Sequence, residues 1–468
     1  MNNLLNAMQT GDSRTFNGMV TNSTSLNDCV DFFFMAGAMR NQPDEVIMSK
    51  FSLAFNEDPL TAMKLLFWAR DVRGGAGERR LARVVYYYLA LEHEDVLIKN
   101  ISLIAEYGRW DDLVQIVSFA DDKLKTAALE EIKKGLESEN ALCAKWMPRP
   151  NKNGKKLANV IRKYLGMTPR EYRKMLANLT NVIESNMCAK DFASINYEHV
   201  PSVAMARYQK AFNRNDEIRF ASYKELLASG NAKINASAVY PHDVTKSVTR
   251  GDAKVANAQW DALPNYMEGS TERIMPMCDV SGSMSGLPMD VSIALGIYIS
   301  ERNVGPFKDY FMTFTSEPTL QKLKGSLSER MRQIKGPVGY NTNVAAAFDA
   351  ILNSAKKKAV SQDDMPTMLL LLSDMEFDDY SISGNDASAL EMIKSKYDAA
   401  GYVMPRIVFW NLDARPGNAP VRFDERGTAL VSGFSPSILT AILKGDDFTP
   451  VGIMNAKINE DRYAPVTI

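Results

Sequence analysis

The sequence predicts an α + α/β protein, with a helical N-terminal half followed by an α/β domain built on a mostly parallel, doubly wound sheet. In the first half, segments 62–70 and 81–90 carry apolar residues at helical spacing. After Arg273, short apolar runs alternate with segments of helical length, which is the pattern of strands joined by helices. The stretch 231–268 is polar and holds few large apolar side chains, so we interpret it as the connection between the halves.

The change of pattern divides the chain into two predicted domains, residues 1–268 and 269–468. In the first domain, segment 71–78 is rich in glycine but lacks the Gly-Lys-Ser/Thr ending of a phosphate-binding loop, so we interpret it as a turn between helices. Segment 106–113 is a second turn that leads into a helix. Successive helical pairs are typical of an α-solenoid of HEAT-like repeats, although no strict period is visible.

The helix expected near residue 170 has the clearest start signal. Thr168 and Glu171 form a capping-box pattern, with Pro169 at the first helical position. One apolar stripe follows at helical spacing and consists of Tyr172, Leu176, Leu179 and Ile183. Three cations fall on the opposite side of the helix: Arg170, Arg173 and Lys174. This helix is therefore expected to pack inward and to present positive charge to solvent.

The α/β half contains five expected strands, at residues 274–278, 309–314, 368–372, 406–410 and 429–431. Its four expected helices cover residues 290–300, 344–352, 387–399 and 435–443. The first of these helices is apolar on most faces, which predicts that it is buried.

Oxygen-bearing side chains follow the first expected strand of the α/β half. The apolar run that starts at Ile274 ends in Asp279-x-Ser281-x-Ser283. Thr342 precedes the helix expected at 344, and Asp374 follows the strand expected at 368–372. Hard divalent cations prefer ligands of this type, and ligands of α/β sheets bind beyond the carboxyl ends of strands. The alternative is a polar strand-to-helix loop with local hydrogen bonds.

These five residues, in this order and at these separations, resemble the metal-ion-dependent adhesion site of von Willebrand factor A domains. The resemblance implies that the two serines and the threonine coordinate Mg²⁺, or another divalent cation such as Mn²⁺ or Ca²⁺. It also implies that the aspartates often act through water and that a partner commonly supplies the last ligand. Three acidic residues after Asp374 are interpreted as a solvated loop: Glu376, Asp378 and Asp379.

The residues do not favour an enzyme. A nucleophile elbow requires Gly-x-Ser-x-Gly, but the window from Gly282 to Gly286 has Met284 at its centre. A phosphatase-type aspartyl nucleophile would usually have a second Asp two positions on, where this chain has Ser281. The three histidines are His93, His199 and His242, and none has zinc-like spacing to another ligand.

Composition indicates a soluble globular protein of 468 residues. The sequence has no apolar run long enough to cross a membrane and no secretory signal, so we expect no membrane association. Its four cysteines are far apart and form no Cys-x-x-Cys pair, which favours a reducing compartment. The predicted location is therefore the cytoplasm.

The overall charge of -1 conceals a basic segment. Residues 145–250 contain 19 Lys plus Arg against 8 Asp plus Glu, a net charge of +11. Such a block is a candidate surface for a polyanion such as nucleic acid. The alternative is a solvated basic face without a dedicated partner.

A helical half joined to an A-type domain resembles the Ro/TROVE family of RNA-binding proteins and an uncharacterised group of the same architecture from bacteria, phages and plants. The residues that carry the resemblance are segments 69–78 and 107–111 together with the A-domain motif. Segment 145–149, Tyr172-Arg173 and segment 200–202 extend it to the uncharacterised group. The resemblance covers residues 30–445.

This resemblance implies a non-enzymatic protein whose helical repeats close into a ring and bind small non-coding or single-stranded RNA. The candidate RNA-binding residues are Arg149, Lys152, Lys155, Lys156, Arg162, Lys163, Arg170, Arg173, Lys174 and Arg207. A ring formed within one chain needs no second copy, so a monomer suffices. The alternative function is metal-dependent protein interaction or assembly, for example in a phage particle, in which a partner supplies an acidic ligand to the metal.

Overall fold

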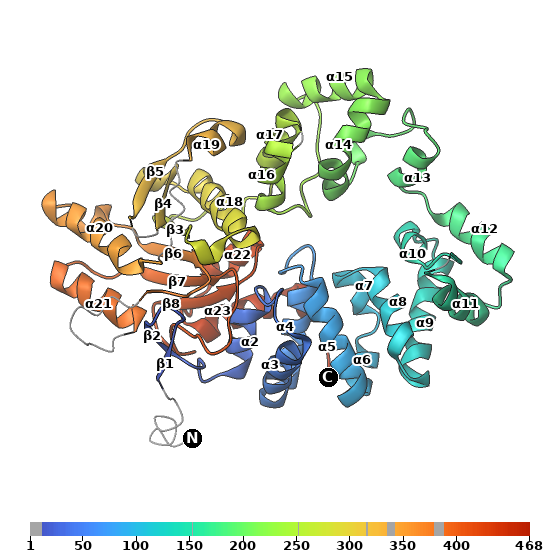
Figure 1. The fold of residues 1–468 in the computed structure, drawn as a ribbon, viewed down its shortest axis with the longest axis horizontal. Helices are drawn as coiled ribbons and strands as arrows, with labels where there is room; N and C mark the ends of the chain where they lie inside the picture. Colours follow the sequence, from blue (N-terminus) through green and yellow to red (C-terminus); the bar gives the residue numbers. More distant parts are fainter. Residues whose placement is uncertain (1–11, 152, 251, 315–316, 335–341, 379–387) are drawn as a thin grey trace. The chain divides into compact units, whose positions relative to one another are not determined.

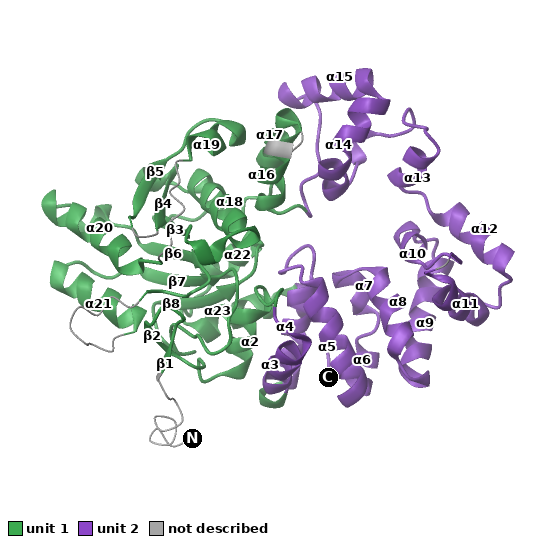
Figure 2. Ribbon diagram, in the orientation of Figure 1, with its two compact units in different colours: residues 1–41, 56–58, 239–461 green, residues 42–55, 59–238, 462–468 purple. Residues whose placement is uncertain are grey.

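The computed structural model describes residues 12–151, 153–250, 252–314, 317–334, 342–378 and 388–468. The chain forms two compact units (Figure 2). Unit 1 contains residues 1–41, 56–58 and 239–461, and unit 2 contains residues 42–55, 59–238 and 462–468. The α + α/β class is confirmed, because an N-terminal helical region precedes a C-terminal mixed sheet of six strands (Figure 1).

Unit 2 is built from helices, and two of them confirm the expected pair. Segment 62–70 lies in α4 (Pro59–Arg70), and segment 81–90 lies in α5 (Arg79–Glu92). The other helices are α3 (Asp44–Glu57), α6 (Glu94–Lys99), α7 (Leu103–Tyr107), α8 (Trp110–Phe119), α9 (Asp122–Glu137), α10 (Ala141–Trp146), α11 (Lys155–Tyr164), α12 (Pro169–Leu179), α13 (Ile183–Cys188), α14 (Ser202–Asn215) and α15 (Glu217–Ala228).

The turn between α4 and α5 is organised around a buried carboxylate. Asp71 accepts hydrogen bonds from the backbone N–H groups of Arg73, at 3.0 Å, and Gly74, at 3.1 Å. Arg462 from the end of the chain donates to the same carboxylate, with Nη2 at 2.7 Å from Oδ1. A Cβ at Gly75 would lie 1.9 Å from the carbonyl oxygen of Trp68, so only glycine fits there. The segment is therefore a turn between helices, as expected.

Arg70, the last residue of α4, forms a buried ion pair with Asp112 of α8. Arg70 donates to Asp112 Oδ2 from Nε at 2.9 Å and from Nη2 at 2.7 Å, and both side chains are almost fully buried. A Cβ at Gly108 would lie 2.6 Å from Asp112 Oδ2 and 2.9 Å from Arg70 Nε. Glycine at this position leaves the room that the pair needs.

The capping box expected at the start of α12 is confirmed. The Thr168 hydroxyl accepts a hydrogen bond from the Glu171 N–H, and the Glu171 carboxylate accepts one from the Thr168 N–H. Tyr172 and Leu176 are fully buried. The expected stripe is shorter than predicted, because α12 ends at Leu179 and Ile183 begins α13.

The sheet of unit 1 has the strand order β5-β4-β3-β6-β7-β8. Its strands are β3 (Ile274–Asp279), β4 (Tyr310–Phe314), β5 (Thr319–Lys322), β6 (Met368–Ser373), β7 (Arg406–Asn411) and β8 (Thr428–Ser432). All neighbours are parallel except β4 and β5, so the five expected strands are joined by one antiparallel edge strand that was not expected. The strand order reverses between β3 and β6, which places a topological switch point there.

The expected helices of unit 1 are present, with others beside them. The expected ones are α18 (Leu287–Arg302), α20 (Val344–Lys357), α21 (Ala389–Ala400) and, for the last, η5 (Pro436–Ile438) with α22 (Leu439–Lys444). The additional ones include α2 (Asp28–Ala36), α19 (Leu327–Gln333) and α23 (Pro450–Ile458). As expected, α18 is largely buried, and it packs against β3, β4 and β6.

The N-terminal residues belong to the sheet unit by their contacts. Strands β1 (Asp12–Arg14) and β2 (Val20–Asn22) form an antiparallel hairpin. Helix α2 is buried along almost its whole length and packs against β7 and β8. A Cβ at Gly37 would lie 2.5 Å from the backbone of Gly433, so the chain passes the sheet closely there. Unit 1 therefore includes residues from both sides of the predicted boundary at 268.

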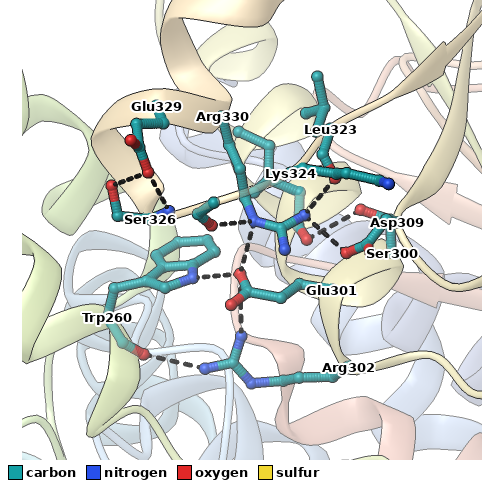
Figure 3. Close-up of polar contacts among 12 residues, drawn as sticks. Trp260, Ser300, Glu301, Arg302, Asp309, Leu323, Lys324, Ser326, Glu329 and Arg330 are labelled. Carbon is teal, nitrogen blue, oxygen red and sulfur yellow. Dashed lines mark hydrogen bonds and ion pairs between the residues drawn. The ribbon is translucent and has the colours of Figure 1, made fainter.

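Residues 231–268 contain the boundary between the two units, at 238/239, but they are more than a polar connection. They contain α16 (Pro241–Arg250) and α17 (Ala253–Asp261), which pack against α18 and α19. Trp260 is fully buried, and its Nε1 donates to Glu301 Oε2 at 2.6 Å (Figure 3). Arg330 lies 3.6 Å from the same carboxylate and forms an ion pair with Asp309 at 2.8 Å. Buried residues such as Trp260 therefore hold this segment against α18, although its average polarity is that of a linker.

Replacing Trp260 with phenylalanine should lower the free energy of unfolding by about 2–3 kcal/mol, because the change leaves a cavity and removes the donor to Glu301. Urea unfolding followed by tryptophan-independent circular dichroism measures the loss. Glu301→Gln is the matched control, since its amide oxygen still accepts from Trp260, and it should cost less. An equal loss in both variants would contradict this prediction, because it would mean that the charge of Glu301 contributes as much as the Trp260 ring and its hydrogen bond together.

Two chain-wide features bear on the expected location. None of the helices in the described part of the chain is long and apolar enough to span a bilayer. All four cysteines carry free thiols, with Cys188 exposed and Cys29, Cys143 and Cys278 buried. Burial raises the pKa of the Cys278 thiol to about 12, so this thiol remains protonated at neutral pH.

Candidate metal centre

The two aspartates of the motif lie at the switch point of the sheet. Asp279 is the last residue of β3, and Asp374 directly follows β6. These strands are parallel neighbours, so their carboxyl ends meet at the same edge. Ser373 links them, because its hydroxyl donates to Asp279 Oδ2 at 2.6 Å. Both aspartates are almost fully buried.

The two serines follow Asp279 in a tight turn. The Ser281 N–H donates to Asp279 Oδ1 at 2.9 Å, which fixes the loop on the carboxylate. The hydroxyl oxygens of Ser281 and Ser283 are 3.1 Å apart, so the i, i+2 spacing brings both hydroxyls to one place, as the sequence predicted. Ser281 is buried and Ser283 is exposed. The pair therefore connects the buried carboxylates to solvent.

A backbone hydrogen bond joins Thr342 to the loop that follows β6. Thr342 precedes α20, and its carbonyl oxygen accepts a hydrogen bond from the Asp378 N–H at 3.2 Å, which ties it to the loop that carries Asp374. Its hydroxyl oxygen is buried and has no hydrogen-bond partner among the described residues. Its neighbours Gly339, Tyr340 and Asn341 lie outside those residues.

Asp374 has one oxygen engaged and one free of hydrogen bonds. Oδ1 accepts from the Glu376 N–H at 3.2 Å. Oδ2 is buried without a hydrogen-bond partner in the described part of the chain, and it forms a long ion pair with Arg415, whose Nη2 lies 3.8 Å away. Met375 turns the chain sharply at this point, with φ of 64°. A buried carboxylate oxygen that accepts no hydrogen bond is costly, and a single long ion pair offsets only part of that cost.

The electrostatics of the site favour a bound cation. Burial raises the pKa of Asp279 well above its usual range, and the negative charge of Asp374 raises it further. A divalent cation would relieve this repulsion and would use the oxygens that lack partners. Within the described residues, no three His, Cys, Asp or Glu side chains gather into a metal-binding group. The candidate ligands of the motif are two carboxylates and three hydroxyls, hard oxygen donors that would suit Mg²⁺, Mn²⁺ or Ca²⁺ rather than zinc.

The interpretation of Glu376 as part of a solvated loop is wrong. Glu376 is only 3% exposed, because the N-terminal hairpin covers it. Its carboxylate accepts from the Phe16 N–H and, at 3.2 Å, from Asn418 Nδ2. Asn17 Nδ2 donates to its carbonyl oxygen at 2.7 Å. Asp378 is half-buried, and Asp379 lies outside the described residues.

The candidate RNA-binding residues divide into two groups. Seven are exposed cations without a hydrogen bond or ion pair in the described structure: Lys155, Lys156, Lys163, Arg170, Arg173, Lys174 and Arg207. Two make internal hydrogen bonds, from Arg149 to the Thr180 hydroxyl and from Arg162 to the Met167 carbonyl oxygen. Lys152 lies outside the described residues. The outward direction predicted for the cations of α12 is confirmed.

Comparison with known proteins places the chain among uncharacterised relatives. Residues 15–141 and 150–271 match a domain of unknown function, DUF2828. Residues 273–464 match a second, DUF7788. The chain is also similar to the uncharacterised protein L728 of Acanthamoeba polyphaga mimivirus, with 30% identity over 496 residues that cover 94% of this chain and 86% of the relative. The chain therefore belongs to the DUF2828 family.

Proposed function

We propose that this chain is a non-enzymatic RNA-binding protein whose C-terminal domain is a von Willebrand factor A-type domain with a divalent cation, in an architecture similar to that of Ro/TROVE proteins. The strand order and the placement of Asp279 and Asp374 at the switch point support the A-type domain. The Thr342 hydroxyl and Asp374 Oδ2, which are buried without hydrogen bonds among the described residues, support the cation. The match at segments 69–78 and 107–111 supports the Ro-like helical module.

The observation that carries RNA binding is the set of seven unpaired cations on α11, α12 and α14. Cations that form no ion pair within the protein are free to contact phosphates, and phosphate contacts dominate the affinity of proteins for nucleic acids. The aromatic residues of this segment contribute little to the proposed surface. Tyr172 is fully buried in the packed face of α12.

The cation would be held by Asp279, Ser281, Ser283, Thr342 and Asp374. It would supply a fixed positive charge that neutralises the two buried carboxylates. Neighbouring residues orient the two carboxylates. Ser373 and the Ser281 N–H orient Asp279, and the turn at Met375 orients Asp374.

The triple variant Arg170→Ala, Arg173→Ala, Lys174→Ala should weaken RNA binding at least about tenfold and lower the slope of log K against log salt by about 2, because three phosphate contacts to a single strand are lost. Fluorescence anisotropy with a labelled oligouridylate at several salt concentrations measures both quantities. The variant should fold normally, since all three side chains are exposed.

The matched control replaces Lys125, Lys133 and Lys134 of α9, which lies outside the basic segment. This control removes the same amount of positive charge. It should leave the affinity for RNA within about threefold of the wild type, because salt screens charges that lie far from the bound strand. Equal losses in both triple variants would show that only net charge matters. Unchanged affinity in the α12 variant would remove this surface from the proposal.

A second function is favoured by one observation. Ser283 is exposed while the other four candidate ligands are buried, so the site opens to solvent on the serine side. We infer that a partner protein could supply an acidic residue there. The double variant Asp279→Ala, Ser281→Ala should abolish Mg²⁺-dependent capture of such a partner and leave oligouridylate binding intact. If the double variant still captured the partner, and the wild type did so in EDTA, the proposed metal-dependent interaction would be contradicted.

A further inference from the structure

A separate cavity of about 390 Å³ lies within unit 2 between α3, α5 and α8. Its volume falls in the range of about 300–1,000 Å³ that is usual for small-molecule sites. Each helix contributes residues four positions apart, such as Arg79, Arg83 and Tyr87 on α5 and Gln115 and Phe119 on α8. Such residues share a helix face, so the cavity is lined by rigid elements.

Positive charge dominates the cavity wall. Three arginines line it, Arg79, Arg80 and Arg83, against one acidic residue, Asp44. Arg80 is paired with Asp44, and Arg83 lies 2.6 Å from Asp112.

Arg79 is the cation without a partner, because no hydrogen bond or ion pair within the described residues reaches its side chain. Burial lowers its pKa, and the nearby charges of Arg109 and Arg83 lower it further. The carboxylates of Asp111 and Asp112 raise it by a smaller amount, so the surroundings of Arg79 hold less negative charge than would balance it. An anion in the cavity would supply that charge.

Another part of the wall is aromatic. The rings of Tyr87 and Phe119 meet edge to face, with centroids 5.3 Å apart. Tyr87 packs against Phe119 and is still 42% exposed, so part of its ring is accessible to a ligand. Beside them, Gln115 Oε1 is buried and has no hydrogen-bond partner in the described part of the chain. The wall therefore offers aromatic ring surface next to an acceptor that lacks a donor.

We propose that this cavity binds a nucleoside monophosphate group, with the phosphate on Arg79 and the base against Tyr87 and Phe119. A guanidinium matches phosphate oxygens with two parallel hydrogen bonds, and aromatic side chains stack on bases of any sequence. Gln115 Oε1 accepts from a hydroxyl or amino group of the ligand. The group is a free nucleotide or the phosphorylated end of a nucleic-acid strand. This proposal uses none of the cations of α11, α12 and α14, so it stands apart from the RNA surface proposed above.

Isothermal titration of the full chain tests the proposal with four probes: AMP, adenosine, and an oligoadenylate with either a 5′-phosphate or a 5′-hydroxyl group. The phosphorylated member of at least one pair should bind at least about tenfold more tightly than its unphosphorylated partner, because it alone pairs with the guanidinium. A preference confined to AMP identifies a free nucleotide. A preference confined to the oligoadenylates identifies a strand end.

Arg79→Ala should remove this preference, and Tyr87→Leu should weaken both members of the pair. Arg214→Ala is the matched control, because Arg214 is also exposed and unpaired within the described residues but lies on α14, away from the cavity. It should retain wild-type affinity. No preference for the phosphate in either pair, or equal losses in the Arg79 and Arg214 variants, would overturn the proposal.

Discussion

Replacing Asp112 with alanine should lower the free energy of unfolding of unit 2 by about 3–5 kcal/mol, because it leaves a buried guanidinium without its counter-charge. Asp112 is fully buried and accepts from Arg70 at 2.9 and 2.7 Å and from Arg83 Nε at 2.6 Å. Arg70 is 1% exposed, so solvent does not replace the counter-charge that its guanidinium loses. Urea unfolding followed by far-ultraviolet circular dichroism measures the loss.

The neighbouring Asp111 provides the control. It pairs with Arg83 at 2.8 Å and Arg109 at 2.6 Å, but all three side chains reach solvent. Asp111→Ala should therefore cost no more than about 1 kcal/mol. The double variant Arg70→Met, Asp112→Leu should recover much of the loss, since apolar side chains of similar volume can replace a buried ion pair. A loss no larger for Asp112→Ala than for Asp111→Ala would contradict this reading of the ion pair.

Replacing Asp279 with asparagine should have opposite effects with and without metal. In EDTA the variant should be more stable than the wild type, because one of two buried negative charges is gone. With Mg²⁺ at a hundred times its dissociation constant, the wild type should gain about 2.7 kcal/mol and the variant nothing. Thermal unfolding in EDTA and in Mg²⁺ measures both differences.

The pH dependence gives this prediction a second readout. The folded-state pKa of Asp279 is raised above its unfolded value, so its contribution to stability is present at low pH and is lost as pH rises toward the folded pKa. In EDTA, the advantage of Asp279→Asn over the wild type should therefore grow with pH. A constant or shrinking advantage would show that burial and the charge of Asp374 do not raise the pKa of Asp279.

Much of the site could be predicted because it depends on local order in the sequence. The run from Ile274 to Cys278 predicts a buried strand, and a strand end fixes where Asp279, Ser281 and Ser283 point. Asp374 follows a second such run, so the parallel arrangement brings it to the same edge. The capping box of α12 is equally local.

The parts that could not be predicted depend on distant contacts. Nothing near Glu376 indicates that residues 15–17 cover it, because the hydrogen bonds join positions about 360 residues apart. Trp260 lies in a polar stretch, and its partner Glu301 is on another helix. Strand β5 was missed because an edge strand alternates between buried and exposed residues and has no long apolar run.

The most direct test of the metal centre is Mg²⁺ binding to the metal-free protein, measured by calorimetry for the wild type and for Thr342→Val. The Thr342 hydroxyl is buried without a partner among the described residues, so it has no structural bond to lose. We predict that the variant is as stable as the wild type in EDTA and binds Mg²⁺ at least about tenfold more weakly, a loss of about 1.4 kcal/mol. Equal affinity for Mg²⁺, or no binding by the wild type, would contradict the proposed site.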